Sequence, residues 1–366
     1  MEMNLRTPIK VLVTGANGKI AYNLVPHLLS GSAFGRDQPI ILHLLSRNPN
    51  GLQGLVMEIE DCIFPLHHGT LATLSVAEAF TDIDVAILLA SVGRGEAKIR
   101  RDLLALNVPI IHSHGKALQR YAKPSAKVLV VTNPCNTMTH VCRLAAPSLV
   151  SSGFTCLTQV DHNRALYQMR SRAPLKSGAV TKVGILGNHS DNVAVCLVTP
   201  KEAECKQDLE LKISEDEEWM IQKAVQSRGG EVISKTRSTS VVSVTAAIID
   251  HLRAWFLGTE RDNWVSMGLV SDGSLGVPSG LICSFPVKPW KWKEDDICKR
   301  RRNYFLYDKR DARRKPWVMK QLEMRLSIRL SGMVISFNRI SGLESPLRAS
   351  KFHLREGFKS LLRFGN

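Results

Sequence analysis

The chain has 366 residues, of which 44% are hydrophobic and 22% are charged, enough apolar side chains to bury the core of one large domain or two. Its formal net charge is +16, but residues 288–366 hold 21 Lys and Arg against 8 Asp and Glu, a balance of +13 that leaves +3 for the remainder. Residues 1–287 therefore lack the excess of positive charge that nucleic-acid binding requires, and we expect no nucleic-acid partner.

Targeting signals and cysteine spacing both favour a cytosolic protein. The first ten residues, MEMNLRTPIK, run directly into the apolar VLVT, so we expect no signal peptide. We also expect no membrane partner, since no apolar run is long enough to cross a bilayer. The eight cysteines form no CxxC pair, which argues against a metal site and against a disulfide framework.

Short apolar runs alternate with amphipathic helical patterns between residues 10 and 190. These runs are VLVT (11–14), IILHLL (40–45), VAILLA (85–90), VLVVT (128–132) and VGIL (183–186). Nearly continuous apolar strands separated by helices are typical of a parallel sheet that is covered on both faces. The sequence therefore predicts an α/β fold with a doubly wound parallel sheet, the Rossmann dinucleotide-binding arrangement.

A glycine-rich turn follows the first of these strands. The segment TGANGKIA (14–21) has GxxGxxA spacing, and a helix is expected from about residue 20 to residue 29. Glycines allow the backbone to approach a pyrophosphate, which the N–H groups and the dipole of the helix N-terminus then bind. The candidate cofactor-binding residues here are Gly15, Gly18, Lys19 and Ile20. The alternative is an ordinary glycine turn in a protein without a cofactor.

The chain beyond residue 190 has a different pattern. Helical patterns at about 215–228 and 239–255 precede the strand-like segments WVSMGLV (264–270) and SGLICSFPV (279–287). This mixture predicts a second, α+β catalytic domain. We therefore expect a dinucleotide-binding domain over residues 1–156, a catalytic domain over 157–297, and a divergent basic tail over 298–366 whose charge-rich composition favours disorder.

Three charged or titratable side chains in the expected catalytic domain, residues 157–297, suggest a role in chemistry. Asp161 and Arg164 stand three residues apart at the start of a helical pattern, and therefore on one face of a helix. His189, in GNHSD, follows an apolar strand, at the strand end where doubly wound sheets bind ligands. Each has a structural alternative, because an Asp-Arg pair is commonly a surface pair and a single histidine is commonly part of a core.

The glycine-interrupted segment SVGRGEAKIRRD (91–102) carries Arg94 and Arg100 after the third apolar strand. Such a segment is suited to a mobile lid that closes over an anionic substrate. The alternative is a solvated, arginine-rich loop.

Taken together, these motifs resemble those of cytosolic-type malate dehydrogenases, within the lactate/malate dehydrogenase superfamily, from about residue 9 to residue 287. The strings that carry the resemblance are VLVTGANGKIAY, FGRDQPIIL, VMEIEDC, VDHNRA, GNHS and VSMGLVSDGSLGVPSGLICSFPV. The resemblance implies an NAD(P)-dependent oxidoreductase that transfers a hydride reversibly between its cofactor and oxaloacetate or malate.

The resemblance also implies roles for the residues singled out above. His189 is similar to the family's catalytic acid/base, and Asp161 to the partner that orients its imidazole and raises its pKa. Arg164 is similar to the arginine that binds the C1 carboxylate of the substrate through two parallel hydrogen bonds.

Four further residues match family positions around the substrate and the nicotinamide. Arg94 matches the arginine that recognises the distal carboxylate, and Arg100 the one that clamps the substrate and polarises its carbonyl. Asn133, in VTNPCNT, resembles a residue that bonds both cofactor and substrate, and we expect a cis bond between it and Pro134. Ser240 matches a site near the nicotinamide.

The end of the second strand departs from the NAD-dependent pattern. Where that pattern has an aspartate that binds the adenosine ribose, this chain has Ser46 followed by Arg47. A carboxylate would repel a 2′-phosphate, whereas a hydroxyl beside a guanidinium would attract one. We therefore predict a preference for NADP(H). The alternative is NAD use or relaxed specificity, with Arg47 in solvent.

Other departures leave alternatives for the function. The lid is rich in glycine, the loop after His189 is shorter than in relatives, and the sequence after about Ile297 does not match the family's final helix. One alternative is that the chain is a dehydrogenase of another 2-oxo acid. The other is that it is a catalytically impaired homologue that binds partners through its basic tail. The resemblance further implies a homodimer, with the helix around residues 56–62 near the interface.

Overall fold

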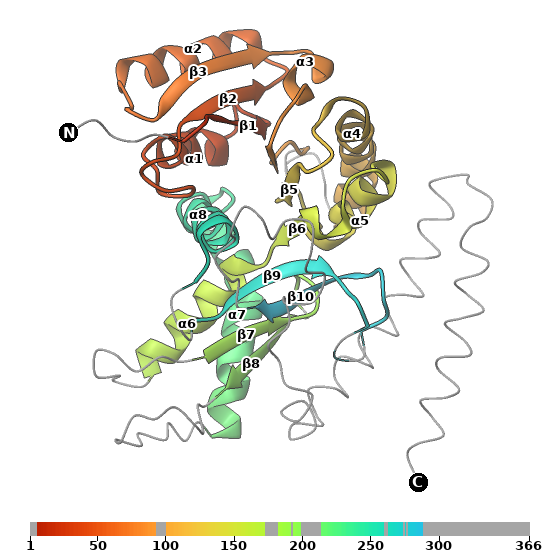
Figure 1. The fold of residues 1–366 in the computed structure, drawn as a ribbon. Coiled ribbons are helices and arrows are strands. Elements are labelled where there is room, and N and C mark those ends of the chain that lie inside the picture. Colours follow the sequence, from red (N-terminus) through yellow and green to blue (C-terminus); the bar gives the residue numbers. More distant parts are fainter. Residues whose placement is uncertain are drawn as a thin grey trace. The chain divides into compact units, whose positions relative to one another are not determined.

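The structure of the chain is a computed structural model that describes residues 6–92, 100–172, 182–191, 193–198, 214–259, 263–273, 275 and 277–287. Within these residues, an eight-stranded sheet has the order β10-β9-β6-β5-β4-β1-β2-β3 (Figure 1). Its strands are β1 (Ile9–Thr14), β2 (Ile40–Leu45), β3 (His67–Thr73), β4 (Val85–Leu88), β5 (Lys127–Val130), β6 (Phe154–Leu157), β9 (Val265–Val270) and β10 (Ile282–Val287).

Strands β1 to β6 are parallel and follow the spatial order 3-2-1-4-5-6. This is the order of a Rossmann domain, and it places the reversal of winding between β1 and β4, where such sheets bind dinucleotides at their carboxyl ends. β9 pairs antiparallel with both β6 and β10, which extends the parallel sheet on one side. The predicted fold class is confirmed.

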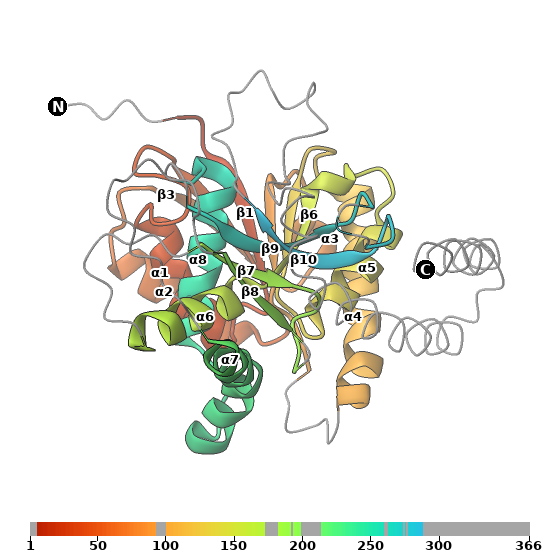
Figure 2. The ribbon, with the colours of Figure 1, turned by 90° about the horizontal axis from the view of Figure 1, so that it is seen from below.

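Helices cover both faces of this sheet. The α-helices of the described residues are α1 (Lys19–Leu29), α2 (Pro49–Asp61), α3 (Val76–Phe80), α4 (Arg100–Tyr121), α5 (Cys135–Ala145), α6 (Gln159–Arg172), α7 (Glu215–Thr236) and α8 (Val242–Leu257). Figure 2 shows α1 and α8 on one face and α4 and α5 on the other, and each of these two pairs is in contact. A parallel sheet covered in this way has apolar side chains on both of its faces, as the strand sequences require.

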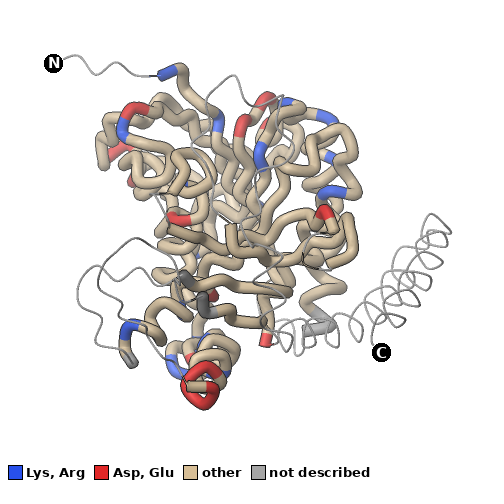
Figure 3. Tube along the Cα trace, turned by 60° about the horizontal axis from the view of Figure 1, so that its bottom comes forward, with Lys and Arg blue, Asp and Glu red and all other residues tan. Residues whose placement is uncertain are grey.

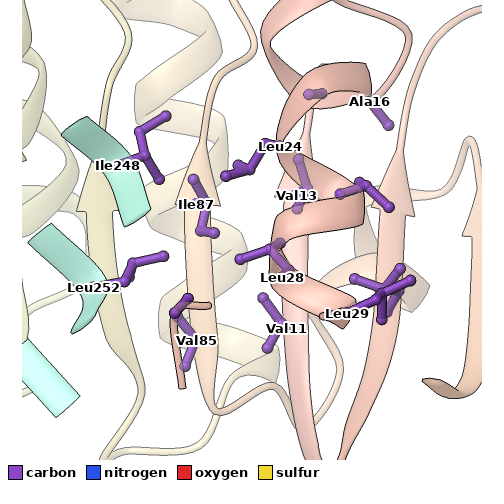
Figure 4. Packing of buried hydrophobic residues seen from close by; sticks show 14 of the residues in the cluster. Val11, Val13, Ala16, Leu24, Leu28, Leu29, Val85, Ile87, Ile248 and Leu252 are labelled. Carbon is purple, nitrogen blue, oxygen red and sulfur yellow. The ribbon is translucent and has the colours of Figure 1, made fainter. Parts of the chain in front are cut away.

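The main core lies between the sheet and the α1–α8 pair. Apolar side chains of β1, β4, α1 and α8 meet there (Figure 4), among them Val11, Val13, Leu24, Leu28, Val85, Ile87, Ile248 and Leu252. A second, smaller core joins α6 and α7 to the strands β7 (Lys182–Leu186) and β8 (Ala194–Val198). The two cores together fix the carboxyl ends of the strands relative to the start of α6.

One predicted strand belongs to a different sheet from the one expected. The run VGIL was expected in the parallel sheet, but it lies in β7, which pairs antiparallel with β8 in a separate two-stranded sheet. The connection between β7 and β8 is short enough for antiparallel pairing, whereas a parallel neighbour needs a crossover of a dozen or more residues. A single bridge between Gly187 and Ser284 links the end of β7 to β10.

Three strands were not predicted, and their sequences explain why. β3, HHGTLAT, is an edge strand in which Thr73 is the one buried residue, so it contains no apolar run. β6, FTCL, is fully buried but has four residues. β8, AVCLV, falls where a loop was expected after His189.

Two properties characterise the surface of the described residues, the distribution of charge and the length of apolar helices. Figure 3 shows Lys and Arg interspersed with Asp and Glu over these residues. None of the helices among the described residues is long and apolar enough to cross a membrane. Acidic side chains gather in the first turn of α7, at the positive end of its dipole, where a Ser214–Glu217 capping box begins the helix.

The contact between β6 and β9 provides a test of the fold. Gly268 lies opposite Cys156, and an added Cβ at Gly268 would lie 2.0 Å from the Cys156 Sγ. We expect Gly268→Ala to lower the free energy of unfolding by about 1–3 kcal/mol, because a well-packed interior does not accept an extra methyl group. Urea denaturation measures the change.

Two further variants make the test specific. Removing the sulfur in the Gly268→Ala, Cys156→Ala double variant should cost less than the sum of the two single changes. Gly54→Ala on α2 is the control, since a Cβ there meets nothing within 4 Å, and it should be neutral or stabilising. Additive costs for Gly268 and Cys156 would contradict the packing described for β6 and β9.

Candidate active site

The glycine turn after β1 forms one side of the site. Gly15 has a φ of +70°, and a Cβ there would lie 2.9 Å from the Ala90 Cα, so the turn packs directly against the chain that leaves β4. The Thr14 Oγ1 accepts hydrogen bonds from the N–H groups of Leu89 and Ala90, each at 3.1 Å. The turn is therefore held at the point where the winding of the sheet reverses.

The N-terminus of α1 faces out of this turn. The N-cap is Gly18, whose position carries no side chain that could cap the helix, and the first turn holds no acidic residue. Gly18 and Lys19 are exposed, and Ile20 is half-buried. A helix N-terminus of this kind can bind an anion through its N–H groups, so these residues fit the pyrophosphate of a dinucleotide.

The end of β2 lies beside the glycine turn. The Asn17 side chain of that turn donates a hydrogen bond to the Asn48 carbonyl at 2.8 Å, and Asn48 caps α2. The Ser46 Oγ accepts a 3.3 Å hydrogen bond from the Asn48 N–H, and Arg47 is exposed. The residues that follow β2 thus offer a hydroxyl, a guanidinium and a helix N-terminus to an adenosine ribose, and no carboxylate.

The start of α6 and the end of β7 bring the predicted catalytic residues together. The Asp161 side chain is only 3% exposed, and its two oxygens have different partners. Oδ1 accepts a 3.0 Å hydrogen bond from the Arg164 Nη1 one helical turn away, and Oδ2 lies 2.6 Å from the His189 Nδ1. The pairing of Asp161 with His189 that the resemblance implies, and the placement of Asp161 and Arg164 on one helix face, are therefore seen in the structure, while their catalytic roles stay predictions.

The geometry sets the state of the imidazole. Burial by itself would lower the pKa of His189, but the charge of Asp161 and the hydrogen bond to it raise this pKa to about 9. Because Nδ1 faces the carboxylate, Nδ1 donates to Asp161, which leaves Nε2 for a substrate. The His189 side chain is 22% exposed. A protonated imidazole at neutral pH is suited to act as a general acid.

Asn133 and Ser240 lie on the described chain, next to helix starts. The bond between Asn133 and Pro134 is cis, as predicted. The Asn133 carbonyl accepts a 2.9 Å hydrogen bond from the side chain of Asn107, whose Oδ1 accepts from the Val92 N–H at 2.9 Å. Asn107 therefore links the loop after β5 to the chain after β4. Ser240 is half-buried and lies just before α8.

The predicted lid lies largely outside the described residues. Arg94 is in the part of the chain that the structure does not describe. Arg100 is the first residue of α4, and its side chain is likewise outside the described residues. The proposed roles of both arginines remain predictions.

Sequence analysis missed two buried asparagines near these residues. Asn107 and Asn136 are almost fully buried, and both bond backbone groups of the site. The available signal was a polar residue on the buried side of a helix, which is rare unless its hydrogen bonds are satisfied.

Neither metal ligation nor disulfide bonding takes part in this arrangement, as far as the described residues go. Among them, no group of three or more His, Cys, Asp or Glu side chains could hold a metal ion. The described cysteines that the structure records as free thiols are Cys62, Cys135, Cys142, Cys156, Cys196 and Cys283.

Comparison with protein families matches both halves of the chain. Residues 9–151 match the lactate/malate dehydrogenase NAD binding domain, and residues 158–297 match the lactate/malate dehydrogenase alpha/beta C-terminal domain. The matched residues include the glycine turn, the start of α6 and the end of β7.

Individual relatives agree with the family match. Cytoplasmic malate dehydrogenase of Homo sapiens is 44% identical over 303 residues, which cover 78% of this chain and 89% of the relative. The Zea mays enzyme of the same name is 43% identical over 289 residues, 77% of this chain and 87% of the relative.

Solved structures of similar proteins have the same fold. Malate dehydrogenase from Naegleria fowleri matches with a TM-score of 0.75 and 30% identity, over 88% of this chain and 98% of that one. Lactate dehydrogenase from Trichomonas vaginalis, solved with NADH and oxamate, matches with a TM-score of 0.76 and 29% identity, over 92% of this chain and 100% of that one.

The pair of His189 and Asp161 gives a direct prediction. In the protein without substrate, the His189 ring resonance should titrate near pH 9 in an NMR titration. In Asp161→Asn this pKa should fall below 6.5, because burial lowers it and the charge and hydrogen bond of Asp161 that raise it are lost. The His189→Gln variant assigns the resonance. A wild-type pKa at or below 6.5 would contradict the geometry.

The same shift predicts how folding stability depends on pH. The folded pKa of His189 lies above its ordinary value of 6.5, so protonation of His189 favours the folded state. This contribution is complete below pH 6.5 and is lost as the pH rises through about 9. The difference in unfolding free energy between the wild type and His189→Gln, measured by urea denaturation, should therefore shrink over that range.

Proposed function

The chain belongs to the lactate/malate dehydrogenase family, and from that membership we propose that it is a malate dehydrogenase that reduces oxaloacetate and oxidises malate with NAD(P)(H). The observation that carries the proposal is the buried Asp161 carboxylate, which holds both His189 and Arg164. This arrangement supplies an acid/base and a carboxylate-binding cation side by side.

His189 handles the proton. In the reducing direction, the protonated imidazole donates its Nε2 proton to the C2 oxygen of oxaloacetate while the C2 carbon receives a hydride. The carbonyl becomes an alcohol, and His189 ends neutral. When bound, NADH or NADPH supplies this hydride. Asp161 holds Nδ1 throughout and stabilises the charged imidazole before transfer. Because His189 ends neutral in this direction, the reverse reaction starts from neutral His189.

Arginines handle the substrate carboxylates. Arg164 uses Nη1 on Asp161 and keeps its remaining N–H donors for the C1 carboxylate of the substrate. We assign recognition of the distal carboxylate to Arg94, and clamping of the substrate and polarisation of its carbonyl to Arg100. A dicarboxylate needs a cation at each end, which favours oxaloacetate over 2-oxo acids with one carboxylate. Asn133 is assigned to both cofactor and substrate.

The cofactor is assigned to the turn after β1 and the end of β2. The N–H groups at Gly18, Lys19 and Ile20 would bind the pyrophosphate, since the Gly15 turn leaves the start of α1 open to an anion. Ser240 is assigned to the nicotinamide end. At the ribose end we propose that Ser46 and Arg47 favour the 2′-phosphate of NADP(H).

Exposed apolar side chains support a homodimer. Tyr22 of α1, Met57 and the adjacent Ile63 at α2, and Val242 of α8 are exposed, and α1 packs against α8. Tyr22 also bonds Glu58, which joins α1 to α2. Scattered apolar residues are common on monomers, but these lie on or directly after three neighbouring helices, and a second copy of the chain would cover them. The names of the relatives support a cytosolic location for this dimer.

Activity and cofactor choice are tested together. The purified full-length protein should reduce oxaloacetate, followed by the loss of reduced-dinucleotide absorbance, with a higher kcat/KM for NADPH than for NADH. Arg47→Gln should lower kcat/KM for NADPH about tenfold to hundredfold, because it removes a charged hydrogen bond to phosphate. The value for NADH should stay within about twofold of wild type.

Two controls accompany this experiment. Arg36→Gln changes an exposed arginine before β2, at the opposite end of the strand, and should leave both values unchanged. His189→Gln should lose roughly 10²-fold or more of the activity with either cofactor. A wild-type preference for NADH would overturn the role of Ser46 and Arg47 but not the dehydrogenase, whereas a folded protein without turnover would overturn the dehydrogenase.

The homodimer is tested by sedimentation velocity. Met57 and Val242 are 58% and 75% exposed. Met57→Asp combined with Val242→Asp should give a monomer, because a charge buried at an interface without a partner is costly. Val150→Asp is the control, since Val150 is 61% exposed but belongs to the segment after α5 and to none of α1, α2 and α8. A double variant that still sediments as the wild-type dimer would refute this interface.

A further inference from the structure

One buried side chain holds the backbone that carries His189. Asn136 is the second residue of α5 and is 5% exposed. Its Oδ1 accepts a 3.0 Å hydrogen bond from the His189 N–H. Its Nδ2 donates to the Gly187 carbonyl at 3.5 Å and to the Ile282 carbonyl of β10 at 3.3 Å. One amide thus joins α5, the turn after β7 and β10.

These contacts fix which way the amide points. An N–H group faces one end of the side chain and two carbonyls face the other, so the oxygen and nitrogen cannot be exchanged without losing all three hydrogen bonds. The Cys135 thiol also donates to this Oδ1, at 3.7 Å, so both groups that face the oxygen are donors. A side chain that only fills space would not need this polarity.

The turn that Asn136 holds also contacts β10 through the bridge between Gly187 and Ser284, but the His189 N–H depends on Asn136. β7 is outside the eight-stranded sheet, so the ladder that positions β1 to β6 does not position His189. Gly187 has a φ of +91°, and its carbonyl also accepts a 2.7 Å hydrogen bond from the Ser284 N–H. That bond fixes Gly187, but the His189 N–H is bonded by Asn136.

We propose that Asn136 is a positioning residue for His189: it holds the His189 backbone so that the imidazole meets Asp161 and presents its Nε2 to the substrate. The inference rests on the proposed acid/base role of His189. Asn136 does not itself touch the imidazole, and it acts through the main chain of the turn.

The proposal predicts a pattern across three variants. Asn136→Ala removes the hydrogen bonds to the His189 N–H and to the Gly187 and Ile282 carbonyls, and kcat/KM for oxaloacetate should fall about 10–100-fold, because small displacements of a catalytic group are costly. Asn136→Asp keeps an oxygen for the His189 N–H but places an acceptor against the Gly187 and Ile282 carbonyls, so it should recover only part of this loss. Thr139→Val removes a buried 2.8 Å hydrogen bond to the Cys135 carbonyl on the same helix and should stay within about twofold of wild type.

A second measurement separates positioning from loss of stability. Among the residues that the structure describes, the groups that act electrostatically on the His189 ring are Asp161 and Arg164 of α6 and the Cys135 thiol of α5. In Asn136→Ala the NMR titration of His189 should move down from about pH 9 towards 6.5, because the contact with Asp161 loosens. Thr139→Val should keep the wild-type titration, and the Kd of the dinucleotide should be unchanged in all three variants.

The outcomes are distinct. Asn136→Ala with wild-type kcat/KM, a lowered rate with an unshifted His189 titration, or equal losses in Thr139→Val would each overturn the positioning role. Should Asn136→Ala fail to fold, Asn136→Ser takes its place. Serine carries a hydroxyl oxygen on a shorter side chain, and the proposal predicts an intermediate shift of the His189 titration for it. The titration needs no turnover, so it decides the positioning role even if the wild type proves inactive towards oxaloacetate, a result that would refute the proposed function alone.

Discussion

The arrangement of the site depends on one buried carboxylate. An isolated anion in the interior would be strongly unfavourable, and Asp161 is stabilised there because each of its oxygens has a cationic or hydrogen-bonding partner. Satisfying the carboxylate brings Arg164 and His189 together, and the carboxylate in turn raises the pKa of the imidazole. The same interaction therefore stabilises the fold locally and sets the chemistry that the site can perform.

Those partners come from parts of the chain with different support. Asp161 and Arg164 share the first turns of α6, so their spacing on one helix is enough to place them together. His189 follows β7, which pairs with β8 alone, and it reaches Asp161 through the contacts of its turn with α5 and β10. Helix geometry fixes one half of the site, and tertiary hydrogen bonds fix the other.

The difference between local and tertiary contacts also explains how much of the fold and the site the sequence could predict. Apolar runs and the glycine turn are local signals, and they were sufficient for most of the parallel sheet, for α1 and for the Asp161–Arg164 spacing. The sheet to which VGIL belongs depends on where the chain goes next, and β3 is an exposed edge without an apolar run. Asn136 was missed because its importance lies in partners 51 and 146 residues away.

The antiparallel extension of the sheet by β9 and β10 bears on how the chain folds during synthesis. Cys156 of β6 pairs with Gly268 of β9, more than 100 residues later. Until that segment leaves the ribosome, β6 is an unpaired edge of an otherwise complete parallel sheet, and closing such a long loop is slow. Nascent chains that end before residue 265 thus present a buried, apolar strand as an open edge, which is a site for chaperone binding or for aggregation.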